Sequence, residues 1–104
     1  MMVRVVGKPA GVDLDDVVVT SSAKADAILV FVKTLAEVDK LCGPVVEAAE
    51  ADRLAWIAYP KARQLGTDLN RDILWQHLLK RHIRGVRQVP IDGVWSAMRF
   101  RPEK

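Results

Sequence analysis

Two continuous apolar runs, separated by a helical pattern, constrain the fold of this chain more than any other feature. Residues 27–32 read AILVFV and residues 54–59 read LAWIAY, without alternation of apolar and polar side chains. Runs of this kind are typical of strands that are buried on both faces of a parallel sheet. Because parallel neighbours need a crossover connection, the sequence predicts a strand–helix–strand unit with a right-handed crossover.

The segment between the two runs carries the signals of an amphipathic helix, which we expect over about residues 35–51. Thr34 and Glu37 have the spacing of a capping box at its start. The Gly43-Pro44 dipeptide predicts a kink or a break within it, since proline removes one backbone hydrogen bond. Its apolar residues fall on one arc at helical spacing: Leu35, Val38, Leu41, Cys42, Val45, Val46 and Ala49.

A second helix is predicted over about residues 70–82, with Gly85 as its stop signal. We expect His82 to act as a carboxyl-terminal cap, and the buried arc to hold Leu74, Trp75, Leu78 and Leu79. Two strand-like runs follow, over about residues 86–91 and 95–100, and the Asp92-Gly93 dipeptide between them is a strong hairpin signal. Residues 2–6 and 17–20 read as further strands.

These signals predict a single α/β domain over residues 1–104, with a less regular amino-terminal part over residues 1–25. We expect a small Rossmann-like sandwich whose mostly parallel sheet ends in an antiparallel hairpin. Hydrophobic residues make up 50% of the chain, which is enough for one core. The single cysteine, Cys42, cannot form an internal disulfide, and no apolar run reaches the roughly 18 residues of a membrane span. We therefore expect a cytoplasmic location and no contact with a membrane.

Three segments carry a resemblance to known proteins: DAILVFVK at residues 26–33, WIAYPK at residues 56–61 and DGVWSAMR at residues 92–99. Through them the chain is similar to a bacterial family of uncharacterised proteins, over about residues 25–101. That family, like the order of elements here, resembles the carboxyl-terminal half of Rossmann-like methyltransferases, which end in such a hairpin. The resemblance implies a Rossmann-like fold, but the family has no established activity to transfer.

The amino-terminal part departs from the methyltransferase pattern. Those enzymes hold their cofactor on a glycine-rich turn after the first strand, with an acidic residue at the end of the second. The corresponding turn here has only Gly7 and Gly11, with Pro9 between them, and no helical pattern follows it. We therefore expect no tight binding of the methyltransferase cofactor, and we expect no other cofactor.

The net charge of +3 conceals an asymmetry between the two halves of the chain. Residues 1–52 carry five basic and nine acidic residues, whereas residues 53–104 carry eleven and four. Seven of these cations lie in the last 25 residues, namely Lys80, Arg81, Arg84, Arg87, Arg99, Arg101 and Lys104. Such a bias attracts nucleic acid or an acidic partner, although helix ends and a solvated sheet edge produce the same pattern.

The sequence predicts no catalytic set and no metal site. His77 and His82 are five residues apart, whereas two metal ligands on one helix need a spacing of about three or four. No serine lies within a G-x-S-x-G elbow. Asp68, Asp92 and the two histidines are the only candidates for a general acid or base.

A ligand-binding site is predicted at the carboxyl edge of the sheet, where open α/β folds bind ligands. Lys33 directly follows the first apolar run and Lys61 closely follows the second, so the two ammonium groups are expected to converge on one anion. Thr34 and the first amides of the following helix add positive potential there. The predicted ligand-binding residues are Lys33, Thr34, Tyr59, Lys61, Arg63 and Arg71.

Three functions remain open. The first hypothesis is a non-enzymatic binding module for an anionic small molecule or an acidic protein partner. The alternatives are a reduced methyltransferase-like enzyme and a nucleic-acid-binding protein that uses the basic carboxyl-terminal third. Steep salt dependence is typical of a nucleic-acid-binding protein, and a general acid or base in the crevice is typical of an enzyme.

Overall fold

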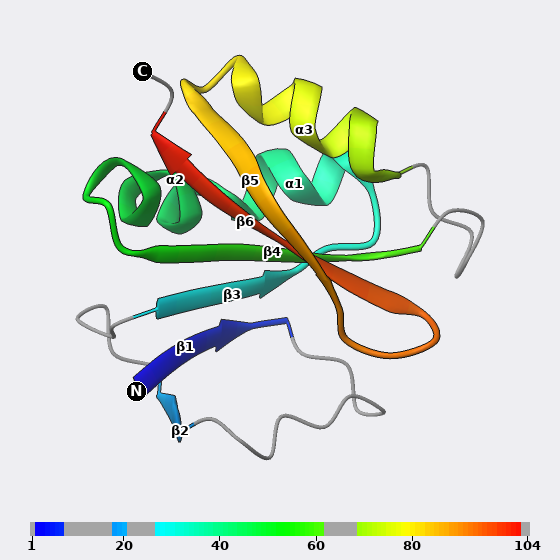
Figure 1. Cartoon of the computed structure of the whole chain (residues 1–104), viewed down its shortest axis with the longest axis horizontal. Helices are drawn as coiled ribbons and strands as arrows, with labels where there is room; N and C mark the ends of the chain where they lie inside the picture. Colours follow the sequence, from blue (N-terminus) through cyan, green and yellow to red (C-terminus); the bar gives the residue numbers. More distant parts are fainter. Residues whose placement is uncertain (1, 8–17, 21–26, 62–68, 103–104) are drawn as a thin grey trace.

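The computed structural model describes residues 2–7, 18–20, 27–61 and 69–102, and it confirms the α/β class (Figure 1). Six strands form one mixed sheet in the order β2-β1-β3-β4-β6-β5. The strands are β1 (Met2–Val6), β2 (Val18–Thr20), β3 (Ala27–Phe31), β4 (Leu54–Pro60), β5 (Ile83–Pro90) and β6 (Trp95–Pro102). The helices are α1 (Leu35–Leu41), α2 (Gly43–Glu50) and α3 (Arg71–Leu79).

The parallel part of the sheet is built on the two apolar runs. β3 and β4 pair in parallel, with Val30 opposite Ile57, and β1 extends the parallel ladder on the other side of β3. Val30 and Ile57 are completely buried. The prediction of two neighbouring buried parallel strands is therefore confirmed.

The hairpin predicted at Asp92-Gly93 is also present. β6 runs antiparallel to both β4 and β5 and lies between them. The backbone N–H groups of Val94 and Trp95 both donate to Oδ1 of Asp92, at 2.8 Å each. These two hydrogen bonds lower the pKa of Asp92, since they stabilise its charged form. Because β4 is parallel to β3 and antiparallel to β6, the pairing within the sheet changes direction at β4.

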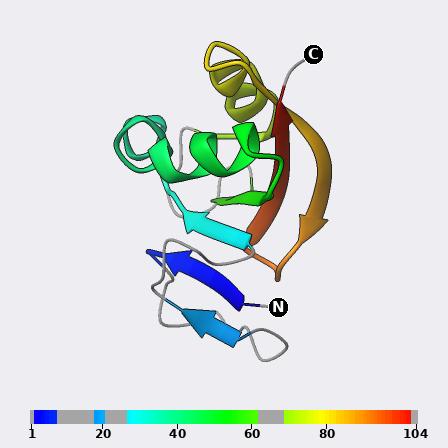
Figure 2. The same cartoon turned by 90° about the vertical axis from the view of Figure 1, so that its left-hand side faces the viewer.

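All three helices cover the same face of the sheet (Figure 2). One core cluster joins Val38, Cys42 and Val45 to Leu74 and Leu78, together with the sheet residues that face them. On the opposite face, the described residues form a smaller cluster of strand and hairpin residues: Phe31, Ala58, Trp95 and Ala97, with Val5, Leu29, Trp56, Ile91 and Val94 at its margin. The described part of the chain thus has one helical layer on one sheet.

The break predicted in the first helical segment is confirmed, because α1 ends at Leu41 and α2 begins at Gly43. Pro44 lies in the first turn of α2, where its missing N–H leaves no hydrogen bond unmade. At the start of α1, the Thr34 hydroxyl accepts the N–H of Glu37 at 3.2 Å, as the capping box predicts. The Glu37 carboxylate, however, accepts the N–H of Lys33 at 2.7 Å instead of the N–H of Thr34.

Three predictions around α3 are wrong. Trp75 was expected in the core, but 41% of it is exposed, because α3 lies over the edge strand β5 and leaves one flank open to solvent. Gly85 does not end the helix and instead lies inside β5. The chain turns at His82, whose φ of 65° is in the left-handed region, so β5 begins three residues earlier than expected.

Within the described residues, no helix is long and apolar enough to cross a membrane.

Candidate functional site

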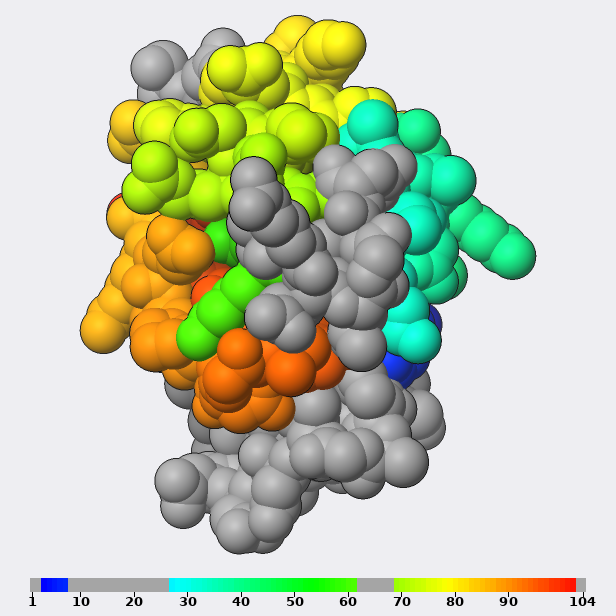
Figure 3. Space-filling model, turned by 90° about the vertical axis from the view of Figure 1, so that its right-hand side faces the viewer, coloured from blue at the N-terminus to red at the C-terminus, as the bar shows by residue number. Residues whose placement is uncertain are grey.

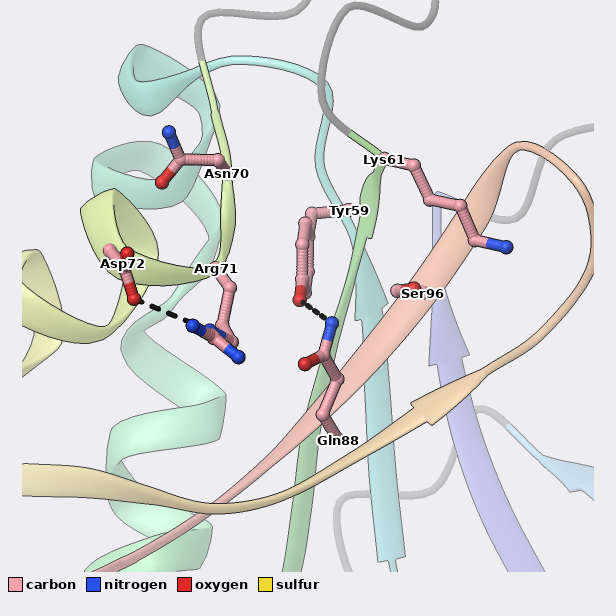
Figure 4. Close-up of a pocket in the computed structure, with 7 residues that line it drawn as sticks. All are labelled: Tyr59, Lys61, Asn70, Arg71, Asp72, Gln88 and Ser96. Carbon is pink, nitrogen blue, oxygen red and sulfur yellow. Dashed lines mark hydrogen bonds and ion pairs between the residues drawn. The ribbon is translucent and has the colours of Figure 1, made fainter.

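An open pocket of about 390 Å³ lies where β4 ends, between the start of α3 and the β5–β6 hairpin. In Figure 3 the end of β4 (green) lies between the start of α3 (yellow-green) and the hairpin (orange). The pocket is lined by Tyr59, Lys61, Asn70, Arg71, Asp72, Gln88 and Ser96 (Figure 4). Four segments distant in the sequence therefore supply its wall.

Tyr59 and Ser96 form the floor of this pocket. They are opposite each other in the β4–β6 ladder, so both side chains lie on the helical face of the sheet. Both residues are buried, and the side-chain amide of Gln88 donates to the Tyr59 hydroxyl at 2.7 Å. Burial raises the pKa of Tyr59, which keeps the phenol protonated and able to donate a hydrogen bond.

The first turn of α3 supplies the wall on one side. Asn70 is the N-cap, and its side-chain oxygen accepts the N–H of Ile73 at 2.9 Å. Arg71 follows, and its Nε lies 3.3 Å from Oδ1 of Asp72. More than half of each of these two side chains is exposed, so the ion pair is weak and open to competition by another anion.

Lys61 stands on the other side of Tyr59 from Arg71 (Figure 4). Its backbone N–H donates to the carbonyl of Val94 at 2.7 Å, which ties the end of β4 to the start of β6. Its ammonium group helps to lower the pKa of Asp92, after the two backbone hydrogen bonds to that carboxylate. The pocket thus has two cations on opposite sides of a buried phenol and a buried hydroxyl.

Three of the six predicted ligand-binding residues, Tyr59, Lys61 and Arg71, line this pocket. Lys33 and Thr34 lie at the same carboxyl edge of the parallel strands but do not line it. The N–H of Lys33 and the hydroxyl of Thr34 both bond within the first turn of α1. Arg63 lies outside the described residues. The convergence of Lys33 with Lys61 therefore stays a prediction.

Four lining residues were not predicted: Asn70, Asp72, Gln88 and Ser96. Asn70 could have been found, because an N-cap places its residue beside the ligand-binding end of a helix. Gln88 and Ser96 had no local signal. Their positions follow from the antiparallel register, which sets Gln88 opposite Met98 and Ser96 opposite Tyr59.

A second polar cluster ties α1 to α3 on the surface. Nε2 of His77 lies 2.6 Å from Oδ1 of Asp39, and Arg81 donates to the same oxygen at 3.3 Å. The hydrogen bond with His77 contributes most to lowering the pKa of Asp39.

Among the described residues, no group of three or more His, Cys, Asp or Glu side chains could hold a metal ion.

Fold and pocket together define a mixed α/β domain with a cationic pocket at the carboxyl end of β4. No family model, curated protein or solved structure matches the chain.

Proposed function

We propose that this chain is a non-enzymatic binding module, which recognises an anionic group of a small ligand or an acidic protein. The observation that carries the proposal is the arrangement of Lys61 and Arg71 on opposite sides of Tyr59 in one open pocket. The two cations come from different segments of the chain, and in Figure 4 the Lys61 side chain extends from Tyr59 toward the hairpin. In the proposed complex the flexible Lys61 side chain turns toward Arg71, and the anion binds to both cations.

Hydrogen-bond donors at this pocket suit an oxyanion. The Arg71 guanidinium offers a planar set of N–H donors, which matches phosphate and carboxylate groups in a bidentate manner. The protonated Tyr59 phenol and the Ser96 hydroxyl add neutral donors at the floor. Asp72 is the one acidic residue among the described lining residues, and its exposed ion pair with Arg71 is weak enough for a ligand to replace.

Calorimetric titration with inorganic pyrophosphate tests the proposal. Replacing both Lys61 and Arg71 with alanine should weaken binding at least tenfold, since a hydrogen bond to a charged group contributes about 1.5–3 kcal/mol. The matched control replaces Lys40 and Lys80, two exposed lysines outside the pocket, and removes the same total charge. Equal losses in the two double variants would show that only net charge matters, and the pocket would then not be the site.

A second candidate function, nucleic-acid binding through the carboxyl-terminal third, is favoured by the register of the hairpin. Arg87 is directly opposite Arg99, and Arg84 is directly opposite Arg101. Like charges in such pairs destabilise a sheet unless an anion lies near them. Nε of Arg99 is buried and has no hydrogen-bond partner among the described residues. Arg101, by contrast, is neutralised by Asp52, which accepts from it at 3.0 Å.

Salt-dependent titration with a single-stranded oligonucleotide tests this second function. If Arg87 and Arg99 each contact a phosphate, replacing both with alanine should reduce the slope of log K against log salt by roughly 1.4. The double variant at Lys40 and Lys80 serves again as the control. A binding constant that does not change with salt would exclude a phosphate-backbone interface.

We also propose that the fold is a shortened relative of Rossmann-like methyltransferases. The support is the β5–β6 hairpin, whose strand β6 pairs antiparallel with β4 at the end of the parallel β1-β3-β4 unit. The resemblance implies a sheet that ends in such a hairpin. A three-layer sandwich would need helices on both faces, and the three described helices share one face. Calorimetry with the sulfonium cofactor should show no binding near micromolar, a level that corresponds to about 8 kcal/mol. Micromolar binding would instead favour the alternative function, a shortened methyltransferase-like enzyme.

A further inference from the structure

A second pocket adjoins the anion pocket along the edge of the sheet. It has a volume of about 270 Å³ and is lined by Arg71, Trp75, Gly85, Val86, Arg87, Gln88 and Met98. Arg71 and Gln88 line both pockets, so the two lie next to each other between α3 and β5, and we refer to them together as the groove. The groove runs from Lys61 at the end of β4 to Trp75 on the second turn of α3.

The far end of this groove is apolar and aromatic. Trp75 and Val86 are 41% and 40% exposed, and they are two of the three large hydrophobic residues exposed in the described part of the chain. Trp75 lies four residues after Arg71, so the two side chains share one flank of α3. Val86 lies at the bulge between Gly85 and Arg87. Neither side chain belongs to the two core clusters of the described residues, and together they offer an apolar surface to a ligand.

Basic residues line both pockets of the groove, but the exposed aromatic side chain lies in only one of them. Lys61 and Arg71 line the anion pocket, whereas Arg71 and Arg87 line the aromatic one, and none of the described residues that line the aromatic pocket is acidic. A ligand that spans both pockets would therefore meet Lys61 and Arg71 at one end and the exposed indole of Trp75 at the other. This order suits a molecule with a negative group at one end and a flat ring at the other.

We infer that the ligand of the anion pocket is a phosphorylated molecule with a flat heteroaromatic ring, of the nucleoside phosphate class. Its phosphate lies against Lys61 and Arg71, and its ring lies on the exposed indole of Trp75. Base–aromatic stacking and guanidinium–phosphate contacts are the two interactions that recognise such molecules. The inference rests on the proposed function, because it names the ligand class of the same site.

Three probes separate the two ends of the groove: inorganic pyrophosphate, adenosine diphosphate and adenosine, each titrated by calorimetry. We expect the diphosphate nucleotide to bind at least fivefold more tightly than pyrophosphate, since stacking on an aromatic side chain contributes at least about this factor. Adenosine alone should bind more weakly than either. Equal affinities for the nucleotide and pyrophosphate would overturn the inference and leave the anion site intact. If none of the three binds, the proposed function fails as well.

Substitutions at Trp75 provide the second test. Trp75→Ala should reduce nucleotide affinity to the level of pyrophosphate and change pyrophosphate affinity by less than twofold, whereas Trp75→Phe should keep most of the gain. The matched control is Ile73→Ala, which removes another exposed apolar side chain of α3 that lines neither pocket. Because Trp75 is exposed, the far-UV circular dichroism should be preserved. An equal loss for both probes in Trp75→Ala, or the same loss in Ile73→Ala, would contradict stacking.

Discussion

Replacing Gly85 with alanine adds one methyl group at a tightly packed point of the hairpin. Gly85 is opposite Phe100 in the β5–β6 ladder, on the helical face of the sheet. A Cβ at this position would lie 2.5 Å from Sδ and 3.2 Å from Cγ of Met98. Met98 is only 3% exposed and belongs to the main core cluster, so its side chain must shift from its packed position to admit the methyl group.

The expected result is a net loss of stability. Overpacking a core by one methyl group costs typically about 1–3 kcal/mol. Removing a glycine restricts the unfolded chain and offsets about 0.4–1 kcal/mol of this. Gly85→Ala should therefore lower the free energy of unfolding by about 1–2 kcal/mol. In a domain of this size, that corresponds to a fall in Tm of roughly 5–15 °C.

Thermal unfolding followed by circular dichroism measures this loss. The control is Gly43→Ala at the start of α2, where a new Cβ has no atom within 4 Å and stability should be unchanged or slightly higher. Truncating the clashing side chain tests the cause. The double variant Gly85→Ala/Met98→Ala should be more stable than additivity predicts, by at least about 0.5 kcal/mol. A Gly85→Ala protein as stable as the wild type would refute the steric argument.

Three further predictions concern individual side chains. Because the pKa of Asp39 is lowered in the folded state, the Asp39 carboxylate contributes to the free energy of unfolding above about pH 4, and this contribution is lost at lower pH. The difference in stability between the wild type and Asp39→Asn, measured by urea denaturation, should therefore shrink on acidification. Tyr59→Phe removes the hydrogen bond with Gln88 and should lower the free energy of unfolding by about 0.5–1.5 kcal/mol, measured by urea denaturation. The Cys42 thiol is fully buried and burial raises its pKa, so iodoacetamide should label it only after unfolding. Rapid native labelling would contradict this.

The sequence predicted the features that depend on neighbours along the chain. The continuous run at residues 27–32 indicated a buried parallel strand, because both of its faces had to be covered. Thr34 identified the start of α1, and Gly43-Pro44 identified the break before α2, since each acts on backbone hydrogen bonds within one turn. Asp92-Gly93 identified the hairpin for the same local reason.

Lys61 and Arg71 were predicted at the site because each follows a local signal, the end of a strand or the start of a helix. Gln88 and Ser96 could not be predicted, since they reach the pocket only through the register of β6 against its two neighbours. That register places Ser96 beside Tyr59, which is 37 residues earlier in the chain. A shift by one residue would have turned both side chains to the opposite face.

The exposure of Trp75 shows most clearly what only the tertiary structure decided. Its helical spacing places it beside Leu74 and Leu78, which are completely buried, so periodicity alone indicates a core residue. The strand order makes β5 the edge of the sheet, and no other strand of the described chain lies beneath that flank of α3. Local sequence determines which face of an element is apolar. How much of that face is covered depends on which strands pair. Strand pairing depends on how apolar side chains from distant segments are buried together, so no single segment determines it.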